Sequence, residues 1–210
     1  TALLITTFSF SQVSLEIKNV DTSAGTLDIY MTNQAGCSYC TDSEYVNKIG
    51  CEIYGTEGAT WEFSTEIDSA TCVAWDQNNE GIHGDYFNGN VKGAQFYLNG
   101  IIISEVSGGA ADEFLDYLSV NSNADCDADG QVDEGCNFIM AFSMGGAEVD
   151  PSDEGQLLMT IEFENMNGNE ICFAGTEYIE DAIVNWSEAI VSSQPLEGEF
   201  IGEPVLVDWG

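Results

Sequence analysis

The sequence predicts an all-β fold, an antiparallel β-sandwich. Apolar residues alternate with polar ones at a period of two, as at Val13, Leu15 and Ile17, and helical periodicity is scarce. Turn-forming clusters of Gly, Asn and Ser, such as 98–100, 107–109 and 167–169, separate the apolar runs. About nine short strands with frequent turns are typical of a sandwich rather than of alternating strands and helices.

Each predicted strand is a short run rich in apolar residues. The two opening runs, 13–18 and 27–32, alternate throughout. The further predicted strands are 94–98, 101–106, 138–143, 157–163, 170–174, 182–186 and 199–207. One helical turn is expected within 111–118, because Phe114, Leu115 and Leu118 follow the spacing of one helix face.

One stretch interrupts this pattern. Between residues 34 and 90 the chain is rich in Cys, Gly and Asn, and only 60–67 reads as a strand. So few aliphatic side chains would form a weak core. We therefore expect residues 12–210 to form a single sandwich domain with 34–90 as a disulfide-rich insertion. A small subdomain is the alternative.

The charge of the chain excludes some functions. Against 37 Asp and Glu stand three Lys and no Arg, which gives a formal net charge of −34. No basic surface is available to bind nucleic acid, and phosphate chemistry would lack cationic side chains. Most of the carboxylates are expected to be solvated. Copies of such a chain can pack together only if salt or divalent cations offset their repulsion.

No catalytic arrangement stands out. Every triad with an imidazole would need His83, the single histidine, and Gly-x-Ser-x-Gly and zinc-protease signatures are absent from the sequence. Carboxylate pairs carry no weight in so acidic a chain. We therefore expect no enzymatic activity, and His83 to be a surface residue.

Seven cysteines indicate disulfides and an extracellular or cell-surface location. Cys126 and Cys136 flank one short loop and are the expected bridge. The pairing of the other four candidates is open, and in a reducing compartment these four could hold zinc instead. They are Cys37, Cys40, Cys51 and Cys72. An odd count leaves one thiol over.

The acidic run 125–133 predicts a calcium site. Oxygen-bearing side chains alternate along it and Gly130 allows a tight turn at position 6, which suits calcium, a hard cation that binds oxygen ligands. The predicted ligands are Asp125, Asp127, Asp129, Gln131 and Asp133. The run resembles EF-hand or dockerin loops and the loops of thrombospondin type 3 repeats. Cys136 replaces the usual Glu at position 12, so Glu134 or a distant acid would complete the shell. A solvated acidic turn is the alternative.

A second, weaker calcium loop is predicted over 76–85, with Gly81 at its bend. It resembles a thrombospondin type 3 loop more than an EF-hand, because Ile82 follows the glycine directly. An ordinary Asn/Gly turn is equally compatible with the sequence. The predicted ligands are Asp76, Asn78, Glu80 and Asp85.

Residues 1–11 are apolar and uncharged. They look like the end of a bacterial secretory leader cut before Gln12, but such a run also favours strand pairing when it is retained. Donation of this segment to a neighbouring subunit is the main hypothesis, and docking on its own fold is the alternative. No apolar run is long enough to predict a membrane span. The predicted assembly residues are Leu3, Leu4, Ile5, Phe8 and Phe10.

Tryptophan and a glycosylation signal give weaker indications. Trp61, Trp75, Trp186 and Trp209 could supply sugar-stacking platforms, but aromatic residues at strand spacing are usually core. Asn185 begins an Asn-Trp-Ser sequon and is a glycosylation candidate.

About two-thirds of the chain is similar to cohesin-like sandwich domains of secreted bacterial proteins. The segments that carry this resemblance are 25–33, 91–98, 138–143, 155–163 and 170–173. The resemblance implies an immunoglobulin-like or jelly-roll strand order and a role in adhesion and assembly. The Cys-rich insertion and the acidic loop depart from the family's pattern.

These observations predict a secreted structural subunit of an extracellular bacterial filament or adhesive assembly. Strand donation from residues 1–11 would join copies into a homo-polymer, and calcium would be the cofactor that stiffens the acidic loops. The alternative is a monomeric calcium-dependent module that binds a carbohydrate or a protein. Neither hypothesis involves nucleic acid.

Overall fold

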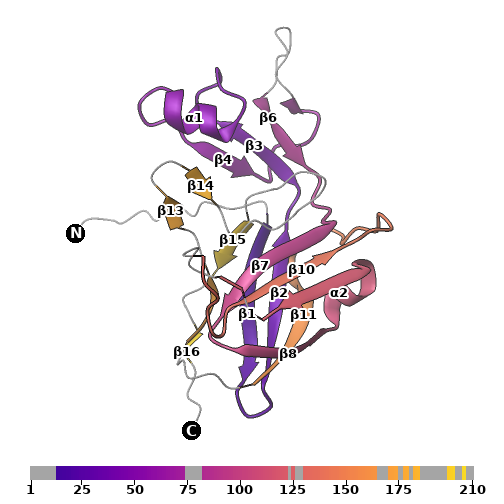
Figure 1. Ribbon diagram of the computed structural model, residues 1–210. Coiled ribbons are helices and arrows are strands. Elements are labelled where there is room, and N and C mark those ends of the chain that lie inside the picture. The colour runs from indigo at the N-terminus through magenta and orange to yellow at the C-terminus, as the bar shows by residue number, and fades with distance from the viewer. Residues whose placement is uncertain are drawn as a thin grey trace, which may run out of the picture. The chain divides into compact units, whose positions relative to one another are not determined.

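The computed structural model, shown in Figure 1, describes residues 13–73, 82–122, 124–125, 130–164, 170–174, 177–179, 182–184, 198–201 and 205–206. They fall into two compact units. The smaller contains the described residues of Gln34–Gly89, and the larger contains those of Val13–Asn33 and Asn90–Gly210. Among the residues described, none of the helices has the length and hydropathy needed to cross a bilayer.

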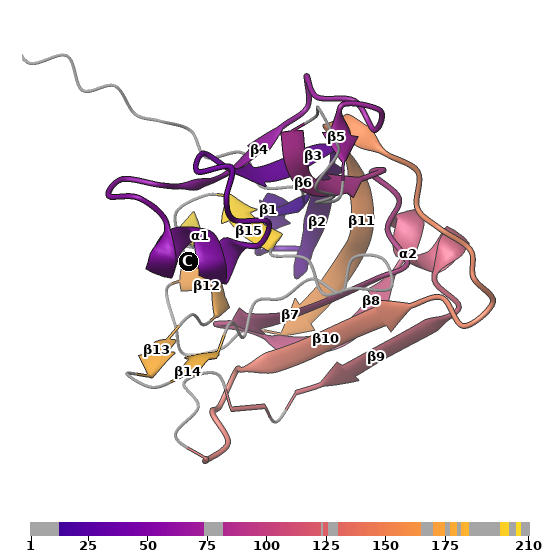
Figure 2. The ribbon, with the colours of Figure 1, turned by 90° about the horizontal axis from the view of Figure 1, so that it is seen from above.

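The larger unit is built on two five-stranded sheets, as the sequence predicts. The first has the order β15 (Gly198–Ile201), β1 (Val13–Asp21), β2 (Thr26–Asn33), β11 (Ser152–Glu164), β8 (Ile102–Ser107). The second has the order β16 (Val205–Leu206), β12 (Glu170–Ala174), β7 (Gly93–Asn99), β10 (Asn137–Phe142), β9 (Tyr117–Asn121). Figure 2 shows β1, β2 and β11 in one layer and β7, β10 and β9 in the other. The all-β sandwich is confirmed.

Within these two sheets, neighbouring strands are antiparallel except β1 and β15, which are parallel. A separate hairpin joins β13 (Glu177–Ile179) to β14 (Ala182–Val184). The core of the sandwich follows from the period of two. On β2, Leu27, Ile29 and Met31 are fully buried, and Phe96 of β7 and Ile139 of β10 are buried in the second sheet.

The expected helix within 111–118 is wrong in its second half. The helix, α2, spans Gly109–Phe114, and β9 follows it. The chain leaves the helix at Leu115, whose backbone is extended. Apolar residues at positions 114, 115 and 118 fit a helix face, but Tyr117 and Val120 favour a strand that pairs with β10 in unbroken register. Cross-strand packing overrides the weak helical pattern.

The smaller unit contains more regular structure than the single predicted strand. Its sheet has the order β4 (Trp61–Ser64), β3 (Gly36–Cys40), β6 (Ile82–Phe87), β5 (Cys72–Val73), and α1 (Lys48–Tyr54) precedes β4 in the chain. Asn47 caps α1 by accepting a hydrogen bond from Gly50 N at 2.8 Å. The strands were missed because cysteines and glycines stand where aliphatic residues would otherwise mark the alternation.

Two disulfides tie this unit together. Cys40–Cys51 joins β3 to α1, and Cys37–Cys72 joins β3 to β5 across the intervening β6. Gly84 of β6 makes that crossing possible, because a Cβ there would lie 2.7 Å from Cys37 Sγ. The four sulfurs are bonded in two pairs, so none of them is available as a zinc ligand, and the zinc alternative for these cysteines is wrong.

The remaining cysteines divide as follows. Cys136 is disulfide-bonded, and its predicted partner, Cys126, lies outside the described residues. Cys172 on β12 keeps its thiol. The bridge Cys126–Cys136 therefore stays a prediction.

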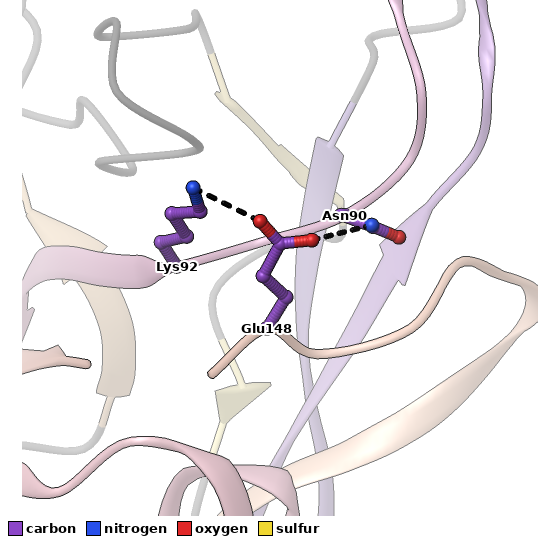
Figure 3. Close-up of polar contacts among 3 residues, drawn as sticks. All are labelled: Asn90, Lys92 and Glu148. Carbon is purple, nitrogen blue, oxygen red and sulfur yellow. Dashed lines mark hydrogen bonds and ion pairs between the residues drawn. The ribbon is translucent and has the colours of Figure 1, made fainter. Parts of the chain in front are cut away.

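An ion pair stabilises the larger unit next to the isolated β-bridge between Val91 and Val149. Glu148 accepts hydrogen bonds from Lys92 Nζ at 2.9 Å and from Asn90 Nδ2 at 2.5 Å, as Figure 3 shows. The Lys92 hydrogen bond, followed by that of Asn90, lowers the pKa of the Glu148 carboxyl from its ordinary value.

We expect Glu148→Gln to destabilise the protein in a pH-dependent way. Because the native pKa of Glu148 lies below its unfolded value, the carboxylate stabilises the fold fully above the unfolded pKa. That contribution is lost as the pH falls through the lower native pKa. Urea unfolding of both proteins should differ at pH 7, and the difference should vanish in acid. In a Lys92→Met background the same substitution should have a smaller effect. A difference that does not change with pH would contradict the assignment.

Candidate functional site

The predicted calcium loop lies in the connection between β9 and β10. Asp125, its first predicted ligand, accepts a hydrogen bond from Gly130 N on Oδ2 at 2.7 Å. Gly130 has a φ of +85°, the left-handed conformation that glycine adopts most readily. Asp125 Oδ1 is buried and accepts no hydrogen bond from any described residue. A buried carboxylate oxygen without a donor is a suitable ligand for a hard cation.

Backbone hydrogen bonds close the base of this connection. Asp133 N donates to Ala124 O at 2.9 Å, and Cys136 N donates to Asp133 O at 3.2 Å. The side chain of Asn137, at the start of β10, donates to Gly135 O at 3.0 Å. The two ends of the loop are therefore held together by the protein itself.

The structure places only part of the predicted ligand set. Asp125 and Asp133 lie near the closed base, and Gln131 is exposed. Asp127 and Asp129 lie outside the described residues. Within the ranges that the structure describes, no three acidic, His or Cys side chains are grouped as a metal site. Among the described ligands, Asp125 Oδ1 is the oxygen that is free to bind a cation, and the calcium site stays a prediction.

Of the four ligands predicted for the second calcium loop, the structure describes one, Asp85. Asp76, Asn78 and Glu80 lie outside the described residues. Asp85 is exposed on β6, opposite Ser38 of β3. His83, on the same strand, is half-buried rather than fully exposed.

The other predicted site residues also lie largely outside the described part of the chain. Leu3, Leu4, Ile5, Phe8 and Phe10 are among these, as are Asn185 and three of the four tryptophans. Trp61 is half-buried on β4. The hypotheses on strand donation and glycosylation therefore stay predictions.

The predicted calcium loop adjoins the outer face of the second sheet through Tyr97 of β7. Burial raises the pKa of the Tyr97 hydroxyl, and the negative charge of Asp125 raises it further. Tyr97 also contacts Phe138 of β10, with 4.9 Å between ring centroids. An acidic loop and an aromatic surface thus meet at one end of β7 and β10.

Sequence reasoning missed this aromatic surface and the edge strand beside it. The sequence shows that both faces of this strand are apolar, because Phe138, Met140 and Phe142 alternate with Ile139 and Ala141, but it does not show which face lies outside. Such a strand is normally buried on both sides. Here Phe138, Met140 and Phe142 are half-buried on the face away from the core.

Comparisons with protein-family models, with curated proteins and with solved structures found no match to this chain. The resemblance to cohesin-like sandwiches stays a prediction. The functional argument therefore depends on the residues of this chain.

Proposed function

We propose that this chain is a structural subunit of an extracellular filament or adhesive assembly. Copies are joined when residues 1–11 of one copy add as a strand to the sheet edge of the next, and calcium stiffens the loop beside that edge. The observation that carries the proposal is the edge formed by β9, which is regular and uncharged.

Edge strands of monomeric proteins are usually protected against pairing. β9 ends the second sheet, carries no charged residue, and pairs with β10 without a register shift. β8, at the edge of the first sheet, carries Glu105 and a register shift opposite Glu162 and Phe163. The contrast between the two edges favours β9 as the acceptor.

The proposed donor suits this acceptor. Residues 1–11 contain no charged side chain and are rich in Thr, Leu, Ile and Phe, which makes them prone to pair as a strand. They lie outside the described residues. An uncharged donor on an uncharged edge keeps carboxylates out of the contact, which matters for a chain of net charge −34.

Calcium has two roles in this proposal. Asp125 presents a buried oxygen that accepts no hydrogen bond from the described residues, in the loop that leads from β9 to β10, so a cation there would stiffen the end of the acceptor strand. Divalent cations also reduce the repulsion between anionic copies. The disulfides of the smaller unit support assembly outside the reducing cytosol.

We expect the full chain to form species larger than the monomer in calcium, measured by size-exclusion chromatography with light scattering. Deletion of residues 1–11 should give a folded monomer. Ser119→Lys, which places a charge on the β9 edge, should also give a monomer. Chelation with EDTA should lower both the oligomer fraction and the melting temperature.

Ser104→Lys is the matched control, because it adds the same charge to β8, an edge strand of the first sheet. It should assemble like the parent chain. A parent chain that stays monomeric in calcium, or a folded deletion variant with unchanged oligomeric state, would refute the proposal. A melting temperature that does not respond to EDTA would refute the role of calcium.

A further inference from the structure

The outer face of the second sheet carries aromatic side chains where a solvent-facing surface normally carries polar ones. In the register of β9, β10 and β7, three rows of residues cross the sheet on this face. We call this surface the aromatic face; its rows are Asn121–Phe138–Tyr97, Ser119–Met140–Gln95 and Tyr117–Phe142–Gly93.

Burial confirms that these rows face away from the core. The alternate positions on β10 and β7, among them Ile139, Ala141 and Phe96, are fully buried. Phe138 and Phe142 are half-buried, and Tyr117 is 39% exposed. The rings form two clusters. Tyr97 and Phe138 make the first, with 4.9 Å between ring centroids, and Tyr117 and Phe142 make the second, with 4.5 Å. Each cluster offers ring surface to a ligand from solvent.

None of these nine residues carries a carboxylate or an ammonium group, although the chain has 37 Asp and Glu. The outer face of the first sheet is different. There Lys18 lies opposite Asp28, and Asp28 accepts a hydrogen bond from Thr160 Oγ1 at 2.7 Å. The lack of charge is therefore a property of the outer face of β7, β9 and β10 and not of the whole surface.

We propose that the aromatic face binds a neutral polysaccharide. Aromatic rings stack on the apolar faces of sugar rings, and the amides of Gln95 and Asn121 and the hydroxyl of Ser119 can donate to and accept from sugar hydroxyls. Phe138 and Phe142 are four residues apart on β10, about 14 Å along an extended strand, so the two ring clusters span several linked sugars.

The charge and shape of the face favour this ligand over the alternatives. An anionic polysaccharide would be repelled by a chain of net charge −34. A protein partner would need a contiguous apolar centre, but polar Ser119 and Gln95 flank Met140 in the middle row. Gly93, next to Phe142 in the last row, has no side chain; a Cβ there would lie 2.9 Å from the Cβ of Phe142. No side chain of this row therefore projects above the sheet at that end. This binding does not depend on assembly of the chain.

Affinity electrophoresis of the full chain tests the proposal, with hydroxyethyl cellulose and galactomannan as neutral probes and alginate as the anionic one. We expect retardation by at least one neutral probe and none by alginate. Phe142→Ala should weaken binding about tenfold, the effect of losing one ring contact. Tyr117→Ala, at an exposed position, should weaken it without affecting folding. Tyr30→Ala is the matched control, because Tyr30 lies opposite Glu16 on the charged outer face of the first sheet.

Several outcomes would overturn the inference. These are no retardation by either neutral probe, equal retardation by alginate, or binding by folded Tyr117→Ala and Phe142→Ala that matches the parent. Self-association that Phe142→Ala abolishes, with no effect of the probes, would make the face a contact between copies instead. The result for a chain that lacks residues 1–11 separates this inference from the proposed assembly, because polysaccharide binding should survive that deletion.

Discussion

Replacing both Cys37 and Cys72 with alanine is expected to unfold the smaller unit while the sandwich stays folded. Among the described residues of the smaller unit, the buried hydrophobic side chains are four half-cystines and Phe87. The disulfides are therefore most of its core. In the described part of this unit, Phe87 is the one other buried apolar side chain that could replace their contacts.

The expected size of the effect comes from chain entropy. Cys37–Cys72 joins residues 35 positions apart, and closing a loop of that length stabilises a fold by about 4 kcal/mol. A unit with so small an apolar core has little stability beyond that.

Hydrogen exchange read by mass spectrometry measures the two units separately. Peptides from 34–73 and 82–89 should lose protection in the double variant, and peptides from β2, β7 and β10 should keep it. Cys172→Ala is the control, since it removes a thiol of the larger unit and breaks no disulfide. Retained protection in the smaller unit would show that its core is stronger than its buried residues indicate.

The sandwich could be predicted because its strands alternate cleanly. Leu27, Ile29 and Met31 each face the core with a polar neighbour on either side, and that pattern identifies both the strand and its buried face. The smaller unit gave no such pattern. In its strand Gly36–Cys40, four of the five residues are buried. These four are glycine, cysteine and serine residues, which give no periodic hydrophobic signal.

The other features that could not be predicted from the sequence depend on contacts between residues far apart in the chain. The pairing of Cys37 with Cys72 depends on β6 passing between their strands, which no local spacing of cysteines reveals. The strand 137–142 reads as apolar on both faces, so the sequence alone cannot indicate that Phe138 and Phe142 face outward. The acidic loop could be predicted as a calcium site because its candidate ligands follow one another in sequence, and the unpaired oxygen of Asp125 is, among the described residues, the one local feature that agrees with that prediction.

Asn137→Leu is expected to destabilise the larger unit by about 3 kcal/mol, although leucine is apolar and of similar size. Asn137 is 0% exposed at the start of β10, directly after the disulfide-bonded Cys136. Its Nδ2 donates to three backbone carbonyls, Ile101 O at 2.8 Å, Gly135 O at 3.0 Å and Leu98 O at 3.1 Å. Its Oδ1 accepts from Ile103 N at 3.4 Å.

Leucine would fill the space and leave those carbonyls without this donor, at a cost of about 1–3 kcal/mol for each buried group that finds no other partner. The side chain pins the turn between β7 and β8 to the end of the acidic loop, so the substitution should also loosen that loop. Urea unfolding measures the loss of stability. Asn19→Gly is the control, because it removes one exposed hydrogen bond to Asp28 at a position with a φ of +51°, which glycine adopts without strain. It should cost less than about 1 kcal/mol. Equal stability of Asn137→Leu and the parent would mean that water replaces the amide and that the two turns are held together by their backbones alone.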